Sequence, residues 1–440
     1  GEFGVMLNLA HSEVTTNSEG IKYGRIGKVS NATNWGTTET RYIPSSIGVS
    51  DNTYNRVRDG GSFAAQWQNN DHTMLATFQY NVSRKHETWE EYVMTSASGV
   101  STYGKDYDYV STSDTEVQCL QGTTCAFDDG GFLTSGTLVT GDNIWKGSVS
   151  YPDGSNLFNY DWSGASQSGT DFTTTSRYSD GVNDTRDAAF NFKWDPTERL
   201  KLNFDVQYIK ATQTNYDISA ELATYQNTSW DLTGDLPHFT VSNPSNINLT
   251  DGGITDASNY RLTDLMDHVT DSDGNEFATR FDAEYSFDSP WLKSLKVGAR
   301  YADRDQTVRW TTYNWASVVN YWSSYSSDDY FITGSSFPDS NAYGLKSFDS
   351  NFFGGGITNA TSAVFFNMNY LKNQSLMAEL FGKDNYSAGG YNAWESVCDR
   401  DDLVEGCFKA AEIAKVSEKT KALYAVLKFG GNEATIFNGI

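Results

Sequence analysis

The chain has 440 residues, of which 14% are aromatic, and a formal net charge of −24. Such an acidic chain cannot neutralise a phosphate backbone, so we expect no nucleic acid partner. Aromatic residues are too abundant for a disordered acidic chain. No segment approaches the roughly 18 consecutive apolar residues of a membrane-spanning helix, which excludes a helical membrane protein but not a membrane β-barrel.

Alternating apolar residues predict a series of β-strands joined by short polar turns. The first strand runs from Phe3 to Leu9, three hairpins follow, and the last strand contains Leu423, Ala425, Leu427 and Phe429. The apolar faces of the hairpins are Phe63, Ala65 and Trp67 with Met74, Ala76, Phe78, Tyr80 and Val82; Phe190, Phe192 and Trp194 with Leu200, Leu202, Phe204, Val206 and Tyr208; and Phe281, Ala283, Tyr285 and Phe287 with Leu295, Val297, Ala299 and Tyr301. Polar residues alternate with these, so the other face is polar.

Aromatic residues mark both ends of the predicted strands. Next to the short turns stand Trp67, Trp194 and Trp291, and about nine to eleven residues beyond the turns stand Tyr80, Tyr208 and Tyr301. Two aromatic levels one bilayer thickness apart are typical of an outer-membrane barrel. A soluble β-sandwich also has alternating strands and remains the alternative.

The connections between hairpins are long, whereas the turns within them are short. Long loops are predicted at residues 14–61, 93–185, 212–276 and 312–416. Bacterial outer-membrane barrels have short periplasmic turns and long extracellular loops. The pattern accounts for about nine strands, the last scarcely begun. Because an open sheet edge cannot lie in lipid, we expect further strands, outside this sequence, to close the barrel.

The four cysteines form two local pairs, Cys119 with Cys125 and Cys398 with Cys407. In an extracellular, oxidising location, such pairs predict disulfides that close short loops. A zinc site is the alternative, although no histidine pair accompanies the cysteines.

No arrangement typical of a catalytic or metal site stands out. The five histidines are scattered without metal-ligand spacing. The acidic run Asp271, Asp273, Asn275 and Glu276 departs from a calcium loop and is interpreted as a solvated turn. We therefore expect neither enzymatic activity nor a cofactor or metal.

Aromatic residues of the long loops are the candidate ligand-binding set. They are Trp89, Tyr92, Trp310, Trp315, Tyr321, Trp322 and Tyr325, with Asp305 and Arg309 as polar partners. Sugars pack their C–H faces on aromatic rings and satisfy their hydroxyls with polar side chains. The alternative is that these rings pack the loops against one another.

Four segments resemble one family. The run Ser294-Leu295-Lys296-Val297-Gly298-Ala299-Arg300-Tyr301-Ala302-Asp303-Arg304-Asp305, after Pro290-Trp291-Leu292, resembles a strand segment of TonB-dependent outer-membrane receptors, most closely the proteobacterial group associated with oligosaccharide uptake. The other three segments are Phe3–Ser12, Asn351–Gly355 and Val416–Ala425. They occur in the family's order across nearly the whole chain.

The resemblance implies an antiparallel transmembrane barrel of about 22 strands, plugged in its lumen. Residues 1–440 would form a partial barrel domain that lacks the family's plug domain, TonB box and final strands. The implied function is import of a neutral oligosaccharide across the outer membrane of a Gram-negative bacterium, without covalent chemistry. Implied partners are outer-membrane lipid and a TonB-type energising complex, and a surface lipoprotein is a candidate partner.

Three other functions stay open. A ferric-siderophore receptor would share the fold, but acidic loops are a less natural site for an anionic chelate. A passive porin would lack the plug and TonB box in the complete gene. A soluble carbohydrate-binding β-protein would be released into aqueous buffer without detergent.

Overall fold

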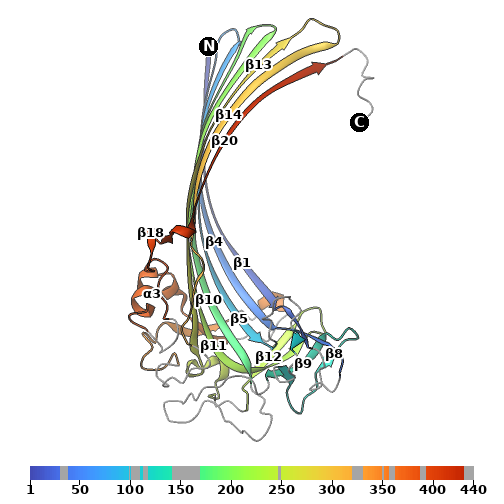
Figure 1. Ribbon diagram of the computed structural model, residues 1–440, viewed down its shortest axis with the longest axis vertical. Helices are drawn as coiled ribbons and strands as arrows, with labels where there is room; N and C mark the ends of the chain where they lie inside the picture. The colour runs from blue at the N-terminus through green and yellow to red at the C-terminus, as the bar shows by residue number, and fades with distance from the viewer. Residues whose placement is uncertain are drawn as a thin grey trace.

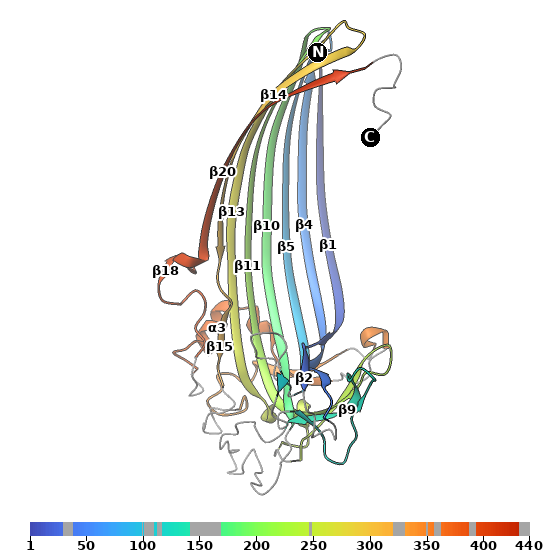
Figure 2. The same ribbon diagram turned by 45° about the vertical axis from the view of Figure 1, so that its right-hand side comes forward.

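The computed structural model is an all-β protein built on one curved antiparallel sheet (Figures 1 and 2). It describes residues 1–29, 38–98, 100, 110–111, 117–140, 169–245, 249–319, 331–348, 351–355, 362–386 and 393–430. Eight long strands follow one another across the sheet: β1 (Glu2–Tyr23), β4 (Ser46–Gln68), β5 (Met74–Ala97), β10 (Thr170–Thr197), β11 (Leu200–Asp231), β13 (Arg261–Ser286), β14 (Leu292–Trp310) and β20 (Ile413–Phe429). Each contains a predicted strand. The expected ninth strand falls within residues 431–440, outside the described residues.

Most of the shorter elements gather at the end of the sheet opposite the short turns, whereas β18 lies nearer its middle (Figure 1). The short strands are β2 (Ile26–Val29), β3 (Arg41–Pro44), β6 (Val110–Ser111), β7 (Val117–Cys119), β8 (Ala126–Phe127), β9 (Leu133–Thr140), β12 (His238–Ser242), β15 (Asn314–Ser317), β16 (Tyr343–Ser347), β17 (Ser362–Phe366), β18 (Leu403–Glu405) and β19 (Phe408–Lys409). The helices are α2 (Met368–Leu371) and α3 (Gln374–Phe381), with 3₁₀ turns η2 (Gly253–Thr255), η3 (Ala257–Asn259), η4 (Phe352–Gly355) and η5 (Ala410–Glu412). No helix in the described part of the chain has the length and apolar run needed to span a bilayer.

The long strands extend beyond the predicted alternation into segments expected to be loops. Their connections on this side are residues 24–45, 98–169, 232–260 and 311–412, each shorter than predicted. Backbone pairing needs no apolar side chain, so the strands continue where both faces have become polar. The run Asp271–Glu276 lies inside β13, and its interpretation as a turn is therefore wrong.

One face of the sheet carries a band of exposed apolar side chains near the short turns. Cα partners in neighbouring strands form a row whose side chains share a face. One row is apolar in all eight strands: Phe3, Trp67, Ala76, Phe192, Phe204, Phe281, Ala299 and Leu423. Phe281 is 46% exposed although its strand is internal to the sheet. We call this row and its apolar neighbours on the same face the apolar band.

The opposite face is polar at the same level, as the alternation predicts. A neighbouring row there reads Gly4, Gln66, Thr77, Asn191, Asp205, Arg280, Arg300 and Ala422. Within it, the Asn191 amide donates to Asp205 at 2.6 Å, and Arg280 donates to the same carboxylate at 2.7 Å. We call this side the polar face.

The apolar band lies on the convex side of the sheet. The Ser176 hydroxyl donates to the Phe366 carbonyl at 2.8 Å, and the Thr174 hydroxyl to the Val364 carbonyl at 2.6 Å. Both hydroxyls share their face with Phe190 of the band, because alternation along β10 is unbroken between them. The segment that they hold, β17 with α3, lies on the convex side (Figure 1). The polar face is therefore concave.

Candidate functional site

Aromatic side chains gather on the polar face, in the half of the sheet nearest the long connections. One row across this half contains Thr16, Tyr54, Trp89, Ser179, Asp217 and His268. Trp310 is the partner of Thr270 and Trp315 is the partner of Met266, two residues to either side of His268. We call Tyr54, Trp89, His268, Trp310, Tyr313 and Trp315 the aromatic platform.

An arginine anchors the β4–β5 part of the platform. Tyr54 and Trp89 stack with ring centroids 6.0 Å apart, and the Arg177 guanidinium lies 5.0 Å from the Trp89 ring centroid. Arg177 donates twice to Asp217, at 2.8 and 2.5 Å. This hydrogen bonding raises the pKa of Arg177, so the group stays cationic. The bidentate geometry fixes the guanidinium over the indole.

A buried histidine anchors the other part. The His268 ring lies 4.9 Å from Trp310 and 4.7 Å from Tyr313, centroid to centroid. Its nitrogens contact the hydroxyls of Thr311 at 2.9 Å and Thr270 at 3.2 Å. Burial lowers the pKa of His268, so the ring is neutral near pH 7. Trp310 and Tyr313 are each 45% exposed and therefore offer ring surface to a ligand.

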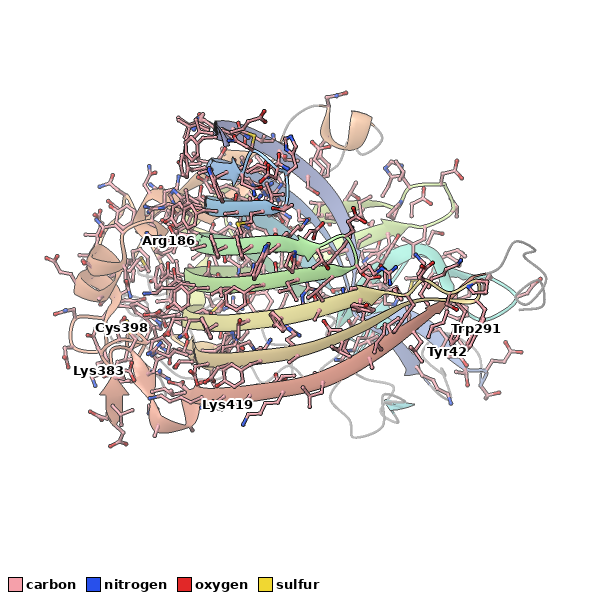
Figure 3. All side chains as sticks on the ribbon, turned by 90° about the horizontal axis from the view of Figure 1, so that it is seen from above. Tyr42, Arg186, Trp291, Lys383, Cys398 and Lys419 are labelled. Atoms are coloured by element: carbon pink, nitrogen blue, oxygen red, sulfur yellow. A yellow bond between two sulfur atoms is a disulfide. The ribbon has the colours of Figure 1, made fainter. Side chains whose placement is uncertain are left out.

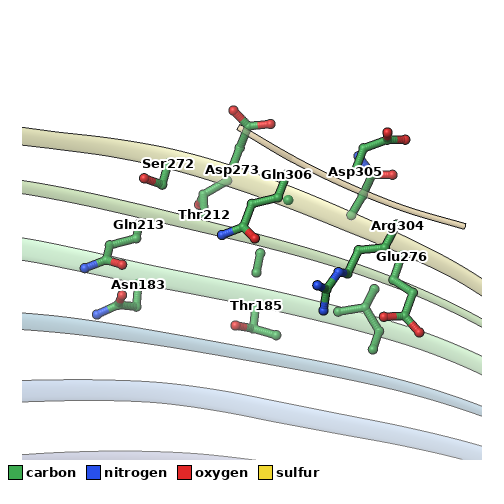
Figure 4. A pocket seen from close by; sticks show the side chains of 14 residues that line it. Asn183, Thr185, Thr212, Gln213, Ser272, Asp273, Glu276, Arg304, Asp305 and Gln306 are labelled. Atoms are coloured by element: carbon green, nitrogen blue, oxygen red, sulfur yellow. The ribbon is translucent and has the colours of Figure 1, made fainter. Parts of the chain in front are cut away.

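A pocket of about 330 Å³ adjoins the platform on the polar face. Most side chains that line it are amides and hydroxyls: Asn183, Thr185, Gln213, Ser272 and Gln306 (Figure 4). The charged Glu276 and Arg304 also line it, and Arg304 binds Glu418 of β20 at 3.3 Å. Ala211 and Gly274, cross-strand partners, leave the space between these side chains open. Ser272 is two residues from Thr270, the partner of Trp310, so the pocket and the platform are contiguous. We call this the amide pocket.

Together the two features provide flat ring surfaces beside a pocket lined mainly by uncharged donors and acceptors. Sugars need both, because their C–H faces pack on rings and their hydroxyls require hydrogen-bond partners. The charges at the platform are paired: Arg177 binds Asp217, and Arg56, whose guanidinium lies 5.4 Å from the Tyr54 ring centroid, binds Glu87. Among the described residues, no group of three or more His, Cys, Asp or Glu side chains could hold a metal ion.

The structure brings together some of the predicted binding residues and separates others. Trp89, Trp310 and Trp315 share the platform. Tyr92, Asp305 and Arg309 occupy the alternate positions of their strands and face the convex side. Tyr321, Trp322 and Tyr325 lie outside the described residues.

The three convex-side residues are directed away from the platform and the pocket. Tyr92 makes an edge contact with Phe365 at 5.4 Å and holds the Lys346 ammonium 4.1 Å from its ring centroid. Arg309 binds Asp273 at 2.8 Å and Glu405 at 2.7 Å. Asp305 points away from the amide pocket (Figure 4).

The sequence analysis missed several residues of the site. They are Tyr54, Arg177, Asp217, His268, Tyr313 and the side chains of the amide pocket. Those in the long strands lie an even number of residues from the polar-face residues of the predicted hairpin on the same strand. Continuing the alternation beyond the last apolar residue would have placed them on one face.

Both predicted disulfides are present, Cys119–Cys125 and Cys398–Cys407. The second stabilises a loop next to the platform. Arg400 in this loop binds Glu412 at 2.8 Å, and Glu412 accepts from the Thr312 backbone at 3.0 Å, one residue before Tyr313. Burial alone would raise the pKa of Glu412, but its hydrogen bonds, above all from Arg400, lower it to about 2. The ion pair therefore persists at neutral pH.

Comparison with known proteins does not assign the chain to a family. No protein-family model matches it, and neither a curated protein nor a solved structure gives a significant match.

Proposed function

We propose that this chain is part of a TonB-dependent outer-membrane receptor that binds a neutral oligosaccharide and passes it across the outer membrane of a Gram-negative bacterium. The observation that supports this most directly is the difference between the two faces of one sheet. The convex face carries the exposed apolar band, and the concave face carries polar side chains and the aromatic platform. A membrane barrel needs this division, with lipid outside and a polar lumen inside.

The open edges of the sheet fit a barrel that further strands complete. Within the described residues, β1 and β20 each pair with one neighbour only. In lipid, each backbone N–H or C=O group without a hydrogen-bond partner would raise the free energy by roughly several kcal/mol. Strands that pair with these two edges would remove that cost and enclose the polar face as a lumen.

The platform and amide pocket favour a sugar over a ferric siderophore. Amides and hydroxyls make up most of the pocket lining, and its cation Arg304 is paired with Glu418. The platform cations Arg177 and Arg56 are paired with Asp217 and Glu87. An anionic chelate would find few free cations there. The family resemblance implies that import is driven by a TonB-type complex of the inner membrane and involves no covalent chemistry. It also suggests a surface lipoprotein as a candidate partner.

The membrane assignment is tested with one charge placed on either face of β11. Phe204→Arg puts a charge into the apolar band and should destabilise the inserted state by about 2–4 kcal/mol. Gln207→Arg adds the same charge on the polar face, next to Asp187, and is the matched control. We expect only Phe204→Arg to reduce the carbonate-resistant fraction in outer membranes. Release of the wild-type chain into aqueous buffer without detergent would contradict the proposal.

The ligand assignment is tested by calorimetry of the detergent-solubilised full chain with maltohexaose, xylohexaose and mannohexaose. Trp310→Ala should weaken binding of the preferred sugar about tenfold or more, because it removes a central ring surface. Trp291→Ala, at a short turn, is the control and should leave the affinity unchanged. Tight binding of a ferric catecholate with no response to the sugars would favour the siderophore alternative.

A further inference from the structure

Three basic side chains border the apolar band on the side of the long connections. On three adjacent strands, the first convex-face residue beyond the band is basic. These residues are Arg84 on β5, Arg186 on β10 and Lys210 on β11, which follow the band residues Val82, Ala188 and Tyr208. We call them the basic trio. All three are exposed.

Acidic residues offset the charge of the trio only in part: Arg84 lies opposite Asp59 and Asp184, but Lys210 lies opposite no acidic residue. Arg186 and Lys210 are Cα partners, and like charges directly opposite each other destabilise a sheet. Asp184 binds Arg186 at 3.0 Å. For Arg84 and Lys210, no acidic group of the described residues lies within ion-pair distance. The opposed pair of Arg186 and Lys210, exposed on the sheet surface, therefore offers a place for an external anion.

Elsewhere the boundary of the band is mixed in charge. The corresponding position is Asp59 on β4, Asn275 on β13 and Asp303 on β14, and Asp303 binds Lys419 of β20 at 3.1 Å. Arg186 and Lys419 lie on the side of the sheet that also carries Cys398 and Lys383 (Figure 3). The trio differs from these strands in placing two cations, Arg186 and Lys210, directly opposite each other, with no acidic residue opposite Lys210.

We propose that the basic trio binds the phosphate group of an anionic membrane lipid in the leaflet on the loop side. This rests on the proposed membrane insertion, since acyl chains covering the apolar band would bring their head groups to the level of the trio. A phosphate there would relieve the repulsion between Arg186 and Lys210 through charge-assisted hydrogen bonds. Basic residues next to a membrane each add about 1 kcal/mol of attraction to anionic lipid, or about fivefold in affinity.

The test uses the full chain in dodecyl maltoside, with native mass spectrometry of bound dioleoyl phosphatidylglycerol and dioleoyl phosphatidylcholine. We expect the wild type to prefer phosphatidylglycerol. Arg186→Gln with Lys210→Gln should reduce that preference about fivefold for each cation removed. The matched control, Lys193→Gln with Lys201→Gln, removes two cations from the same strands on the polar face and should retain the preference.

Each other outcome overturns a specific claim. Insertion with an unchanged preference in the trio variant, or an equal loss in the control, refutes the lipid site alone. Loss of bound lipid on adding inorganic phosphate at the lipid's concentration identifies a free-phosphate site instead. A wild-type chain that binds neither lipid and leaves the membrane in aqueous buffer refutes both the lipid site and the proposed function.

A second readout depends on the repulsion itself. In zwitterionic micelles the trio variant should unfold at a higher temperature than the wild type, because two opposed like charges are gone. Added phosphatidylglycerol should raise the wild-type unfolding temperature and not that of the variant. Equal stabilisation of both proteins by phosphatidylglycerol would contradict the proposal.

Discussion

Asp217 fixes the guanidinium that lies over the Trp89 ring. Its side chain is 6% exposed and accepts two hydrogen bonds from Arg177. Asp217→Asn keeps the shape but loses the charge and one acceptor, leaving a half-buried cation without its partner. We expect a loss of about 2–3 kcal/mol in unfolding free energy and weaker sugar binding, measured by guanidinium unfolding in detergent and by calorimetry.

An exposed ion pair provides the control for that change. Asp59 binds His11 at 2.7 Å, and both side chains are more than half exposed. Asp59→Asn should therefore change stability less than Asp217→Asn and leave sugar binding intact. Equal effects of the two substitutions would mean that Asp217 has no special role at the platform.

Glu221 links stability to pH at the loop end of β11. Burial, and then the negative charge of Asp264, raise its pKa to about 7 from 4.5. The folded state thus binds this proton more tightly than the unfolded state. Stability from this group is full below about pH 4.5, falls as the pH rises and is lost above about pH 7.

Glu221→Gln should remove this pH dependence. Glutamine retains the acceptor for the Thr175 hydroxyl without a charge to bury. At pH 8 the variant should be more stable than the wild type by about 2–3 kcal/mol, and near pH 5 the difference should shrink, as measured by guanidinium unfolding across pH. Glu379→Gln on α3, an exposed carboxylate, is the control. Parallel pH profiles for Glu221→Gln and the wild type would exclude Glu221 as the source.

At the scale of elements, alternation predicted the eight strands and the two faces of their apolar ends. It could not predict where the strands stop, because hydrophobic contrast ends with the apolar band whereas backbone pairing continues. Trp89 and Tyr92 illustrate the consequence. Treated as loop residues, they form one aromatic group, but in β5 they are three residues apart and face opposite sides of the sheet. The sequence could predict that these rings are suited to binding a ligand, but it could not predict the face of the sheet on which each ring lies without the full extent of the strand.

The long connections contain the contacts that the sequence did not predict. The segment 393–412 reaches the sheet through Asp267, whose buried carboxylate accepts from the Val397 backbone at 2.8 Å and from Asn314 at 2.7 Å. These contacts join positions far apart in the chain. No local pattern of sequence predicts such pairings, whereas the close spacing of the cysteines did predict their disulfides.

The Cys398–Cys407 disulfide should stabilise this segment as a unit. Closing a loop of this length restricts the unfolded chain, so Cys398→Ser with Cys407→Ser should cost about 2–3 kcal/mol locally. Hydrogen exchange should then rise within residues 393–412, while Arg400 and Glu412 preserve part of the protection. The matched control, Cys119→Ser with Cys125→Ser, should affect only the segment around β7 and β9. A rise in exchange across the whole sheet would contradict this independence.

At the scale of the whole molecule, the apolar band runs obliquely to the rows of paired residues. On β20 the last apolar residue of the band is Leu423, whose row reaches Phe3 on β1. On β1 the band continues to Leu9, six residues farther along. Its edge therefore shifts by six residues over the seven intervals between eight strands.

That shift predicts the tilt of the strands in a bilayer. Six residues span about 20 Å along a strand, and seven intervals span about 34 Å across the sheet, which gives an angle of about 30°. A lipid-facing band must lie level in the membrane, so the strands must tilt by this angle from the bilayer normal, close to the roughly 35–45° of outer-membrane barrels. Polarised infrared spectroscopy of the full chain in oriented bilayers should give a mean tilt of about 30–45°. Strands upright in the bilayer, or flat on its surface, would show that the band does not mark a lipid boundary.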